Sequence, residues 1–300
     1  MEKVQIQSKF LEEKDKVILV APAGAVDKAG LDSAIRSLKR MGFIVEIGGS
    51  CTRRMGYLAG EDYLRAADIM QAFMDPSIAG IFCIKGGYGS QRILPMLNYE
   101  LISANPKFFA GYSDITALHI AINQICGLIT YHMPMPSKFE ELDYYSEYRL
   151  NEMLHGKPSF IKYPRGHMPK SLVAGSAEGI LCGGNLSILS TSLGTPYEID
   201  TKGKILFIEE VGEEPYRIDR MLIQLRLAKK FEDAAGVIFG SWTDCKAEEP
   251  EKSLSLMDIL KGLRLKIPAI YDFPCGHSLP TACLPLGAML RMEGTQITLH

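Results

Sequence analysis

The sequence lacks any segment typical of a membrane span or a secretory signal. No run approaches about eighteen consecutive apolar residues, the length at which a transmembrane helix is expected. The start of the chain, MEKVQIQSKFLEEKDK, is charged and has no apolar stretch of the kind found in signal peptides. We therefore expect a cytoplasmic protein that has no membrane partner.

The sequence also lacks a strong charge of either sign. Thirty-three basic and 35 acidic side chains leave a formal charge of −2. Without an excess of basic residues, a dedicated nucleic-acid binder is excluded. The 300 residues are 47% hydrophobic and 23% charged, which is ordinary for a globular chain with room for two domains.

No CxxC pair occurs among the seven cysteines. Their odd number argues against a disulfide framework. Cys275, His277 and Cys283 come nearest to a metal-binding set, but a fourth ligand is missing and the spacing fits no common zinc site. We expect reduced, mostly buried thiols, and neither a metal ion nor an organic cofactor.

Strand and helix patterns alternate through the first half of the chain. Helical patterns are expected at about 27–41, 60–74 and 114–124. The apolar runs between them predict five strands: VILVAPAG, FIVEIG, IAGIFCIKGG, FFAGYS and LITYH. Repeated β–α units of this size predict an α/β fold with a parallel, doubly wound sheet.

The alternation stops between residues 133 and 174, where five prolines and many polar residues occur. We interpret 141–170 as a linker between an N-terminal domain, 1–140, and a C-terminal domain, 171–300. The second half is mixed, with expected strands GILCGGNL, KILFIEEV and AAGVIFGSW. Helices are expected at about 216–229 and 253–263, and the C-terminus predicts a hairpin that turns at Glu293-Gly294.

A candidate nucleophile lies in FFAGYSDITALHI. The apolar strand runs into Gly111-Tyr112-Ser113-Asp114 and then into a helix. A serine on a sharp strand-to-helix turn is presented at the carboxyl edge of the sheet, as in a nucleophile elbow. The second glycine of G-x-S-x-G is absent, because Ile115 stands there. Ser113 or Asp114 acting as a helix cap is the alternative.

The run KGGYGS, residues 85–90, closes the preceding strand with three glycines. Such a turn lets backbone N–H groups approach an anion closely. It is neither a Walker loop nor a dinucleotide-binding fingerprint. Beside a nucleophilic serine, it is a candidate source of a second oxyanion-hole donor.

A serine nucleophile needs a base and an acid that orients it. His277 stands on a tight turn in AIYDFPCGHSLP, and His132, at a strand end, is the second choice. For the acid, the strand KILFIEEV ends in Glu209 and Glu210, which alternation directs to opposite sides, one of them toward solvent. Cys275 is a rival nucleophile, but it is too near His277 in sequence for the two side chains to meet well.

Several of these motifs occur together in one known family. VAPAG, IKGGYGSQRILP, FFAGYSDIT, CGGNLSIL, LFIEEVGEEPYRIDR and PCGHSLP follow one another in this order. The chain resembles the LD-carboxypeptidase family of serine peptidases, which includes muramoyltetrapeptide carboxypeptidases and microcin C immunity peptidases. The resemblance covers nearly the whole sequence.

The resemblance implies a role for particular residues. Ser113 is the implied nucleophile, Glu209 the acid and His277 the base. The backbone N–H groups of Gly87 and Asp114 are the implied oxyanion hole. The implied fold joins a flavodoxin-like N-terminal domain to a C-terminal domain with a small β-barrel, commonly as a homodimer.

The implied substrate is a small peptide, the murein tetrapeptide, which loses its terminal D-alanine. The immunity branch instead cleaves aminoacyl nucleotides, and a binding protein without catalysis is an alternative of another class. No segment matches the aromatic loop that stacks on a nucleotide in the immunity branch, and the single tryptophan, Trp242, follows a strand. The murein substrate is therefore preferred.

Two residues depart from the pattern of the family. Lys85 replaces the arginine expected before Gly-Gly-Tyr-Gly, and Ala23 replaces a serine. Lys85, Arg92 and Arg217 are candidates for binding the terminal carboxylate of the substrate.

Overall fold

The structure is a computed structural model, and it describes residues 5–156 and 161–299. The chain forms two compact units. Of the described residues, unit 1 contains 5–156 and 283–287, and unit 2 contains 161–282 and 288–299. Each unit is built around one sheet.

The sheet of unit 1 has the strand order β11-β5-β4-β3-β1-β2. The segment β2-β1-β3-β4-β5 is parallel and has the order of flavodoxin-like folds, as expected. β11 pairs with β5 in the antiparallel direction. The strands are β1 (Lys16–Val20), β2 (Ile44–Ile47), β3 (Ile78–Cys83), β4 (Phe108–Gly111), β5 (Thr130–His132) and β11 (Leu284–Leu286).

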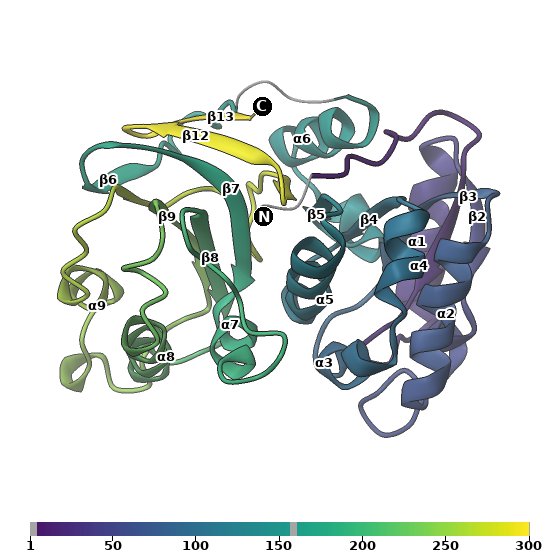
Figure 1. The fold of residues 1–300 in the computed structure, drawn as a ribbon, viewed down its shortest axis with the longest axis horizontal. Helices are drawn as coiled ribbons and strands as arrows, with labels where there is room; N and C mark the ends of the chain where they lie inside the picture. Colours follow the sequence, from purple (N-terminus) through teal and green to yellow (C-terminus); the bar gives the residue numbers. More distant parts are fainter. Residues whose placement is uncertain (1–4, 157–160, 300) are drawn as a thin grey trace. The chain divides into compact units, whose positions relative to one another are not determined.

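Helices connect these strands (Figure 1). Right-handed crossovers place α1 on one face of the sheet and α2, α4 and α5 on the other. Contacts agree, because α1 packs on η5 whereas α2 packs on α4. The helices are α1 (Lys28–Arg40), η1 (Gly49–Thr52), α2 (Asp62–Met74), α3 (Ser90–Ile93), η2 (Leu94–Met96), α4 (Tyr99–Ala104), η3 (Ser113–Ile115), α5 (Thr116–Ala121), η4 (Ile122–Cys126), η5 (Pro136–Glu141) and α6 (Tyr144–His155).

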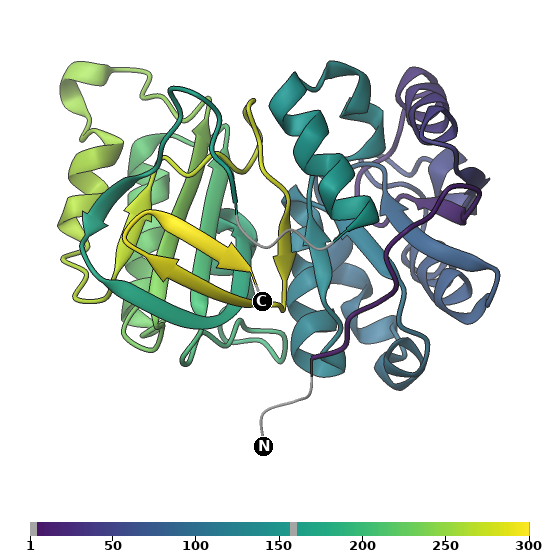
Figure 2. The same ribbon diagram turned by 90° about the horizontal axis from the view of Figure 1, so that it is seen from above.

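Unit 2 contains a seven-stranded mixed sheet, β13-β12-β7-β8-β9-β10-β6. β7, β8, β9 and β10 are parallel, and antiparallel strands flank them on both sides. The sheet curls into part of a barrel (Figure 2). The strands are β6 (Lys170–Val173), β7 (Ser176–Asn185), β8 (Ile205–Val211), β9 (Gly236–Thr243), β10 (Ala269–Tyr271), β12 (Met289–Glu293) and β13 (Gln296–Leu299). The helices are α7 (Leu186–Ser192), α8 (Pro215–Leu227), η6 (Pro250–Lys252) and α9 (Leu256–Gly262).

The expected linker differs from the structure. Helix α6 (Tyr144–His155) lies inside the range 141–170 and belongs to unit 1. Strand β6, which belongs to unit 2, begins at Lys170, the last residue of that range. Asp143 caps α6 by accepting a hydrogen bond from Ser146 N at 2.8 Å. Leu150, Met153 and Leu154 bury one face of the helix. Polar residues cover the opposite face, which is why composition alone suggested a linker.

Three further observations concern the expectations drawn from composition. All seven cysteines are buried and carry free thiols. Within the described ranges, no three His, Cys, Asp or Glu side chains are grouped to hold a metal ion. No helix among these residues has the length and apolar character needed to cross a membrane.

Candidate active site

Ser113 is separated from the end of β4 by Tyr112 alone, and it begins the 3-10 turn η3. Its backbone has φ of +63°, the left-handed region that residues with a side chain rarely adopt. Its side chain is partly exposed, whereas Asp114 beside it is buried. A strained serine between a strand and a helix is the geometry of a nucleophile elbow.

The glycine-rich loop lies against Ser113. A Cβ atom on Gly86 would come within 2.8 Å of Ser113 Cβ and 2.9 Å of Ser113 Oγ. Only glycine therefore allows the loop to approach the hydroxyl this closely. Gly87, the next residue, is exposed and has φ of +97°.

Asp114 joins the glycine-rich loop to the Ser113 turn. Its Oδ2 accepts a hydrogen bond from Ser90 N at 2.8 Å, and Ser90 Oγ donates to Asp114 O at 2.5 Å. Burial raises the pKa of the Asp114 carboxyl, and the hydrogen bonds from Ser90 oppose that rise. Asp114 therefore has a side chain that organises the turn as well as a backbone N–H beside Ser113.

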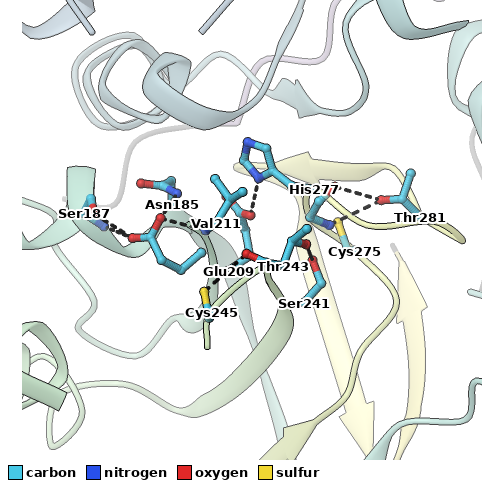
Figure 3. A network of polar contacts seen from close by, with 12 residues as sticks. Asn185, Ser187, Glu209, Val211, Ser241, Thr243, Cys245, Cys275, His277 and Thr281 are labelled. Atoms are coloured by element: carbon cyan, nitrogen blue, oxygen red, sulfur yellow. Dashed lines mark hydrogen bonds and ion pairs between the residues drawn. The ribbon is translucent and has the colours of Figure 1, made fainter. Parts of the chain in front are cut away.

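In unit 2, Glu209 lies near the end of β8 and His277 on the turn after β10 (Figure 3). His277 Nδ1 lies 2.7 Å from Glu209 Oε2. A carboxylate only accepts hydrogen bonds, so Nδ1 carries the proton and Nε2 is left for proton transfer. Glu209 is fully buried, and the His277 side chain keeps 14% of its exposure. This is an imidazole oriented by a carboxylate, as a general base requires.

Glu210 and Glu209 contact different residues, which agrees with the alternation of side chains along a strand. Glu210 does not reach solvent, however, because only 2% of it is exposed. Its carboxylate accepts hydrogen bonds from Asn185 Nδ2, Ser187 N, Ser187 Oγ and Val211 N at 2.6–2.8 Å. The expectation of a solvated second carboxylate is therefore wrong, because Glu210 links the end of β8 to the start of α7.

The alternative candidates have other surroundings. Cys275 is 1% exposed, and its thiol donates to Ala282 O at 3.2 Å. His132 is 1% exposed and packs edge-to-face on Tyr112. Arg92 is held by both oxygens of Asp62, at 2.9 and 3.0 Å from Nε, whereas Lys85 is exposed beside Gly86.

The sequence did not reveal the contacts that support the Ser113 turn in unit 1 or the end of β8 in unit 2. Arg65, Ser90 and Asn185 had no recognised role in either, since each interacts with residues distant in the chain. The only local signal was the adjacency of Ser90 to the three glycines of the loop.

A serine on a strained turn and a histidine paired with a buried carboxylate are the components of a serine hydrolase. A family model described as the LD-carboxypeptidase N-terminal domain matches residues 17–133, and the LD-carboxypeptidase C-terminal domain matches residues 178–292. The chain belongs to the LD-carboxypeptidase family of serine peptidases.

Individual relatives cover nearly the whole chain. A probable murein peptide carboxypeptidase of Bacillus subtilis is 41% identical, over 97% of this chain and 92% of the relative. The microcin C7 self-immunity protein MccF of Escherichia coli is 29% identical, over 91% and 88%. The crystal structure of muramoyltetrapeptide carboxypeptidase from Oxalobacter formigenes is 28% identical and superposes with a TM-score of 0.85, over 95% of this chain and 97% of that one.

Proposed function

We propose that this protein removes the terminal D-alanine from murein tetrapeptide, using Ser113, His277 and Glu209 as a catalytic triad. The observation that carries the proposal is the 2.7 Å pairing of His277 with the buried Glu209, because it supplies an oriented base. The strained turn of Ser113 supports the nucleophile. The names of the relatives support a murein peptide as substrate.

The proposed reaction passes through an acyl-enzyme. His277 Nε2 takes the proton of Ser113 as Oγ attacks the carbonyl carbon of the bond before D-alanine. The N–H groups of Gly87 and Asp114 stabilise the oxyanion, and protonated His277 gives its proton to the departing amine. Water, activated by His277 in the same way, releases the shortened peptide and restores Ser113.

The test is release of D-alanine from a disaccharide tetrapeptide by the wild type and by Ser113→Ala. The wild type should release D-alanine, and Ser113→Ala should lower kcat by at least about 10³-fold. A fluorophosphonate should label the wild type and leave Ser113→Ala unmodified. A wild type that neither releases D-alanine nor reacts with the fluorophosphonate would contradict the proposal. The alternative of a binding protein without catalysis would then be favoured.

A second candidate substrate is an aminoacyl nucleotide, which the similarity to the microcin C7 self-immunity protein favours. The same triad would then cleave an acyl-sulfamoyl or acyl-phosphoramidate bond. Hydrolysis of an aminoacyl-sulfamoyl adenosine, together with no release of D-alanine from the tetrapeptide, would decide for this substrate.

We also propose that the protein works on recycled peptidoglycan fragments in the cytoplasm as a homodimer, as the family resemblance implies. Light scattering of the purified protein checks the dimer. A mass corresponding to one chain at all protein concentrations would contradict it.

A further inference from the structure

Arg65, on helix α2, is among the largest side chains that are fully buried. Burying a guanidinium is costly unless hydrogen bonds and a counter-charge compensate for the lost water. Nη1 donates to Pro22 O at 2.5 Å and to Gly89 O at 2.8 Å. Nη2 pairs with the carboxylate of Asp62, one turn earlier on the helix.

The two carbonyl groups belong to different loops at the carboxyl edge of the sheet. Pro22 lies in the loop after β1, and Gly89 ends the glycine-rich loop after β3. A Cβ atom on Gly89 would lie 2.9 Å from Arg65 Nη1, and its φ is +134°. The third glycine of this loop therefore admits the guanidinium. Gly24 N also donates to Gly86 O at 2.9 Å, so the two loops are joined next to Gly87.

The same loop is held on its other side by the Ser113 turn. The Asp114 carboxylate binds Ser90 N, and Ser90 Oγ binds Asp114 O. Ser90 and Asp114 are 0% and 2% exposed, so water does not compete for these bonds. Gly87 thus lies in a short loop that is anchored at one end by Arg65 and, through Ser90, by Asp114.

We propose that Arg65 is a positioning residue for the oxyanion hole, and that it acts by fixing the loop that carries the Gly87 N–H. The inference rests on the proposed function, in which Gly87 and Asp114 donate to the oxyanion. An oxyanion-hole donor must keep its place to within a fraction of an ångström to stabilise the transition state. Lysine cannot replace arginine here, because a single ammonium lacks the planar fork that reaches two carbonyls and a carboxylate at once.

The experiment compares Arg65→Lys with the wild type in three measurements: kcat and KM for the tetrapeptide, the rate of fluorophosphonate labelling of Ser113, and thermal unfolding. We expect kcat and the labelling rate to fall by about 10²-fold, as when one oxyanion donor is lost. KM should change by less than about threefold, because ground-state contacts remain.

The matched control is Arg149→Lys. Arg149 is 1% exposed on α6, and its guanidinium pairs with Glu152. This variant should lower stability by a similar amount and leave kcat unchanged. If Arg65→Lys does not fold, Ser90→Ala takes its place as a smaller change at the other anchor of the loop. We expect Ser90→Ala to lower both kcat and the labelling rate by about tenfold.

Each outcome is decisive. If Arg65→Lys, or Ser90→Ala in its place, keeps wild-type kcat and labelling rate, the inference is wrong. Equal losses of kcat in Arg65→Lys and Arg149→Lys would show a general structural role and also overturn it. Failure of the proposed function looks different, because the wild type itself would then neither release D-alanine nor react with the fluorophosphonate.

Discussion

The backbone conformation of Ser113 lowers the stability of the folded protein. A residue with a Cβ atom at φ of +63° costs roughly 1 kcal/mol relative to glycine. We predict that Ser113→Gly is more stable than Ser113→Ala by about 1 kcal/mol, while both are inactive. Urea unfolding of the two variants measures the difference. Equal stabilities would mean that the turn relaxes once the hydroxyl is gone.

His119 lies near the Ser113 turn, but it is a buried residue of the core. Its Nε2–H donates to Gly111 O at 3.0 Å, and its Nδ1 accepts from Thr130 Oγ1 at 2.7 Å. Burial lowers the pKa of His119 from 6.5 to about 4. The folded protein therefore requires the neutral imidazole, whereas the unfolded chain takes up a proton below about pH 6.5.

The contribution of His119 to stability should consequently fall as the pH is lowered from 6.5 toward 4. The lowered pKa corresponds to a loss of about 2 kcal/mol in the free energy of unfolding between pH 7 and pH 5. His119→Gln cannot be protonated and should lack this part of the pH dependence. Urea unfolding of the wild type and of His119→Gln at pH 7 and pH 5 measures this part. An equal loss in the free energy of unfolding in both proteins would show that His119 is not its source.

At the scale of elements, the end of β8 depends on Glu210. This carboxylate accepts four hydrogen bonds and offers no donor; three of them tie β8 to β7 and α7, and the fourth comes from Val211 N within β8. Glu210→Gln places an NH₂ group against these donors and should lower the free energy of unfolding by about 2 kcal/mol. The variant should retain measurable turnover, because Glu209 still orients His277.

Glu209→Gln is the matching variant, since it changes the neighbouring carboxylate by the same single group. We expect it to lose most turnover and little stability, the reverse of Glu210→Gln. Kinetics and urea unfolding of the pair distinguish the two roles. Turnover abolished by Glu210→Gln and spared by Glu209→Gln would show that the acid was assigned to the wrong residue.

Elements with strong local signals could be predicted from the sequence. β1, β3 and β4 are continuous apolar runs that end at turn residues, and α1 has an Asp27 cap and a regular apolar spacing. Helix α6 was missed, because its buried face is narrow among many polar residues. β11 was missed as well, since its three residues contain Pro285 and become a strand only by pairing with β5.

Among the candidate site residues too, some features could be predicted from the sequence and others could not. The Ser113 and His277 turns could be predicted, because a polar residue follows an apolar strand within a few positions. The burial of Arg65 could not, since its neighbours on α2 give no sign that carbonyls from two distant loops converge on it. Hydrogen bonds between residues far apart in the chain are a product of the fold and not of local patterns.

At the scale of the whole molecule, the sheet of unit 1 is completed by a strand from the other end of the chain. Leu284 in β11 is fully buried and pairs with His132 in β5. Leu284→Ala should destabilise the protein by about 3 kcal/mol. We expect faster hydrogen exchange at the β5 amides, and unchanged exchange in β5 would contradict the coupling.

The position of β11 also has a consequence for synthesis on the ribosome. Translation produces β1 to β5 long before residues 284–286 leave the exit tunnel. Throughout that interval the nascent sheet has β5 as an open edge, which is a surface prone to pairing with other chains. Native closure of this edge must therefore wait until residues 284–286 have left the exit tunnel, so a product that is stalled or truncated before that point should be a target for chaperones and proteases.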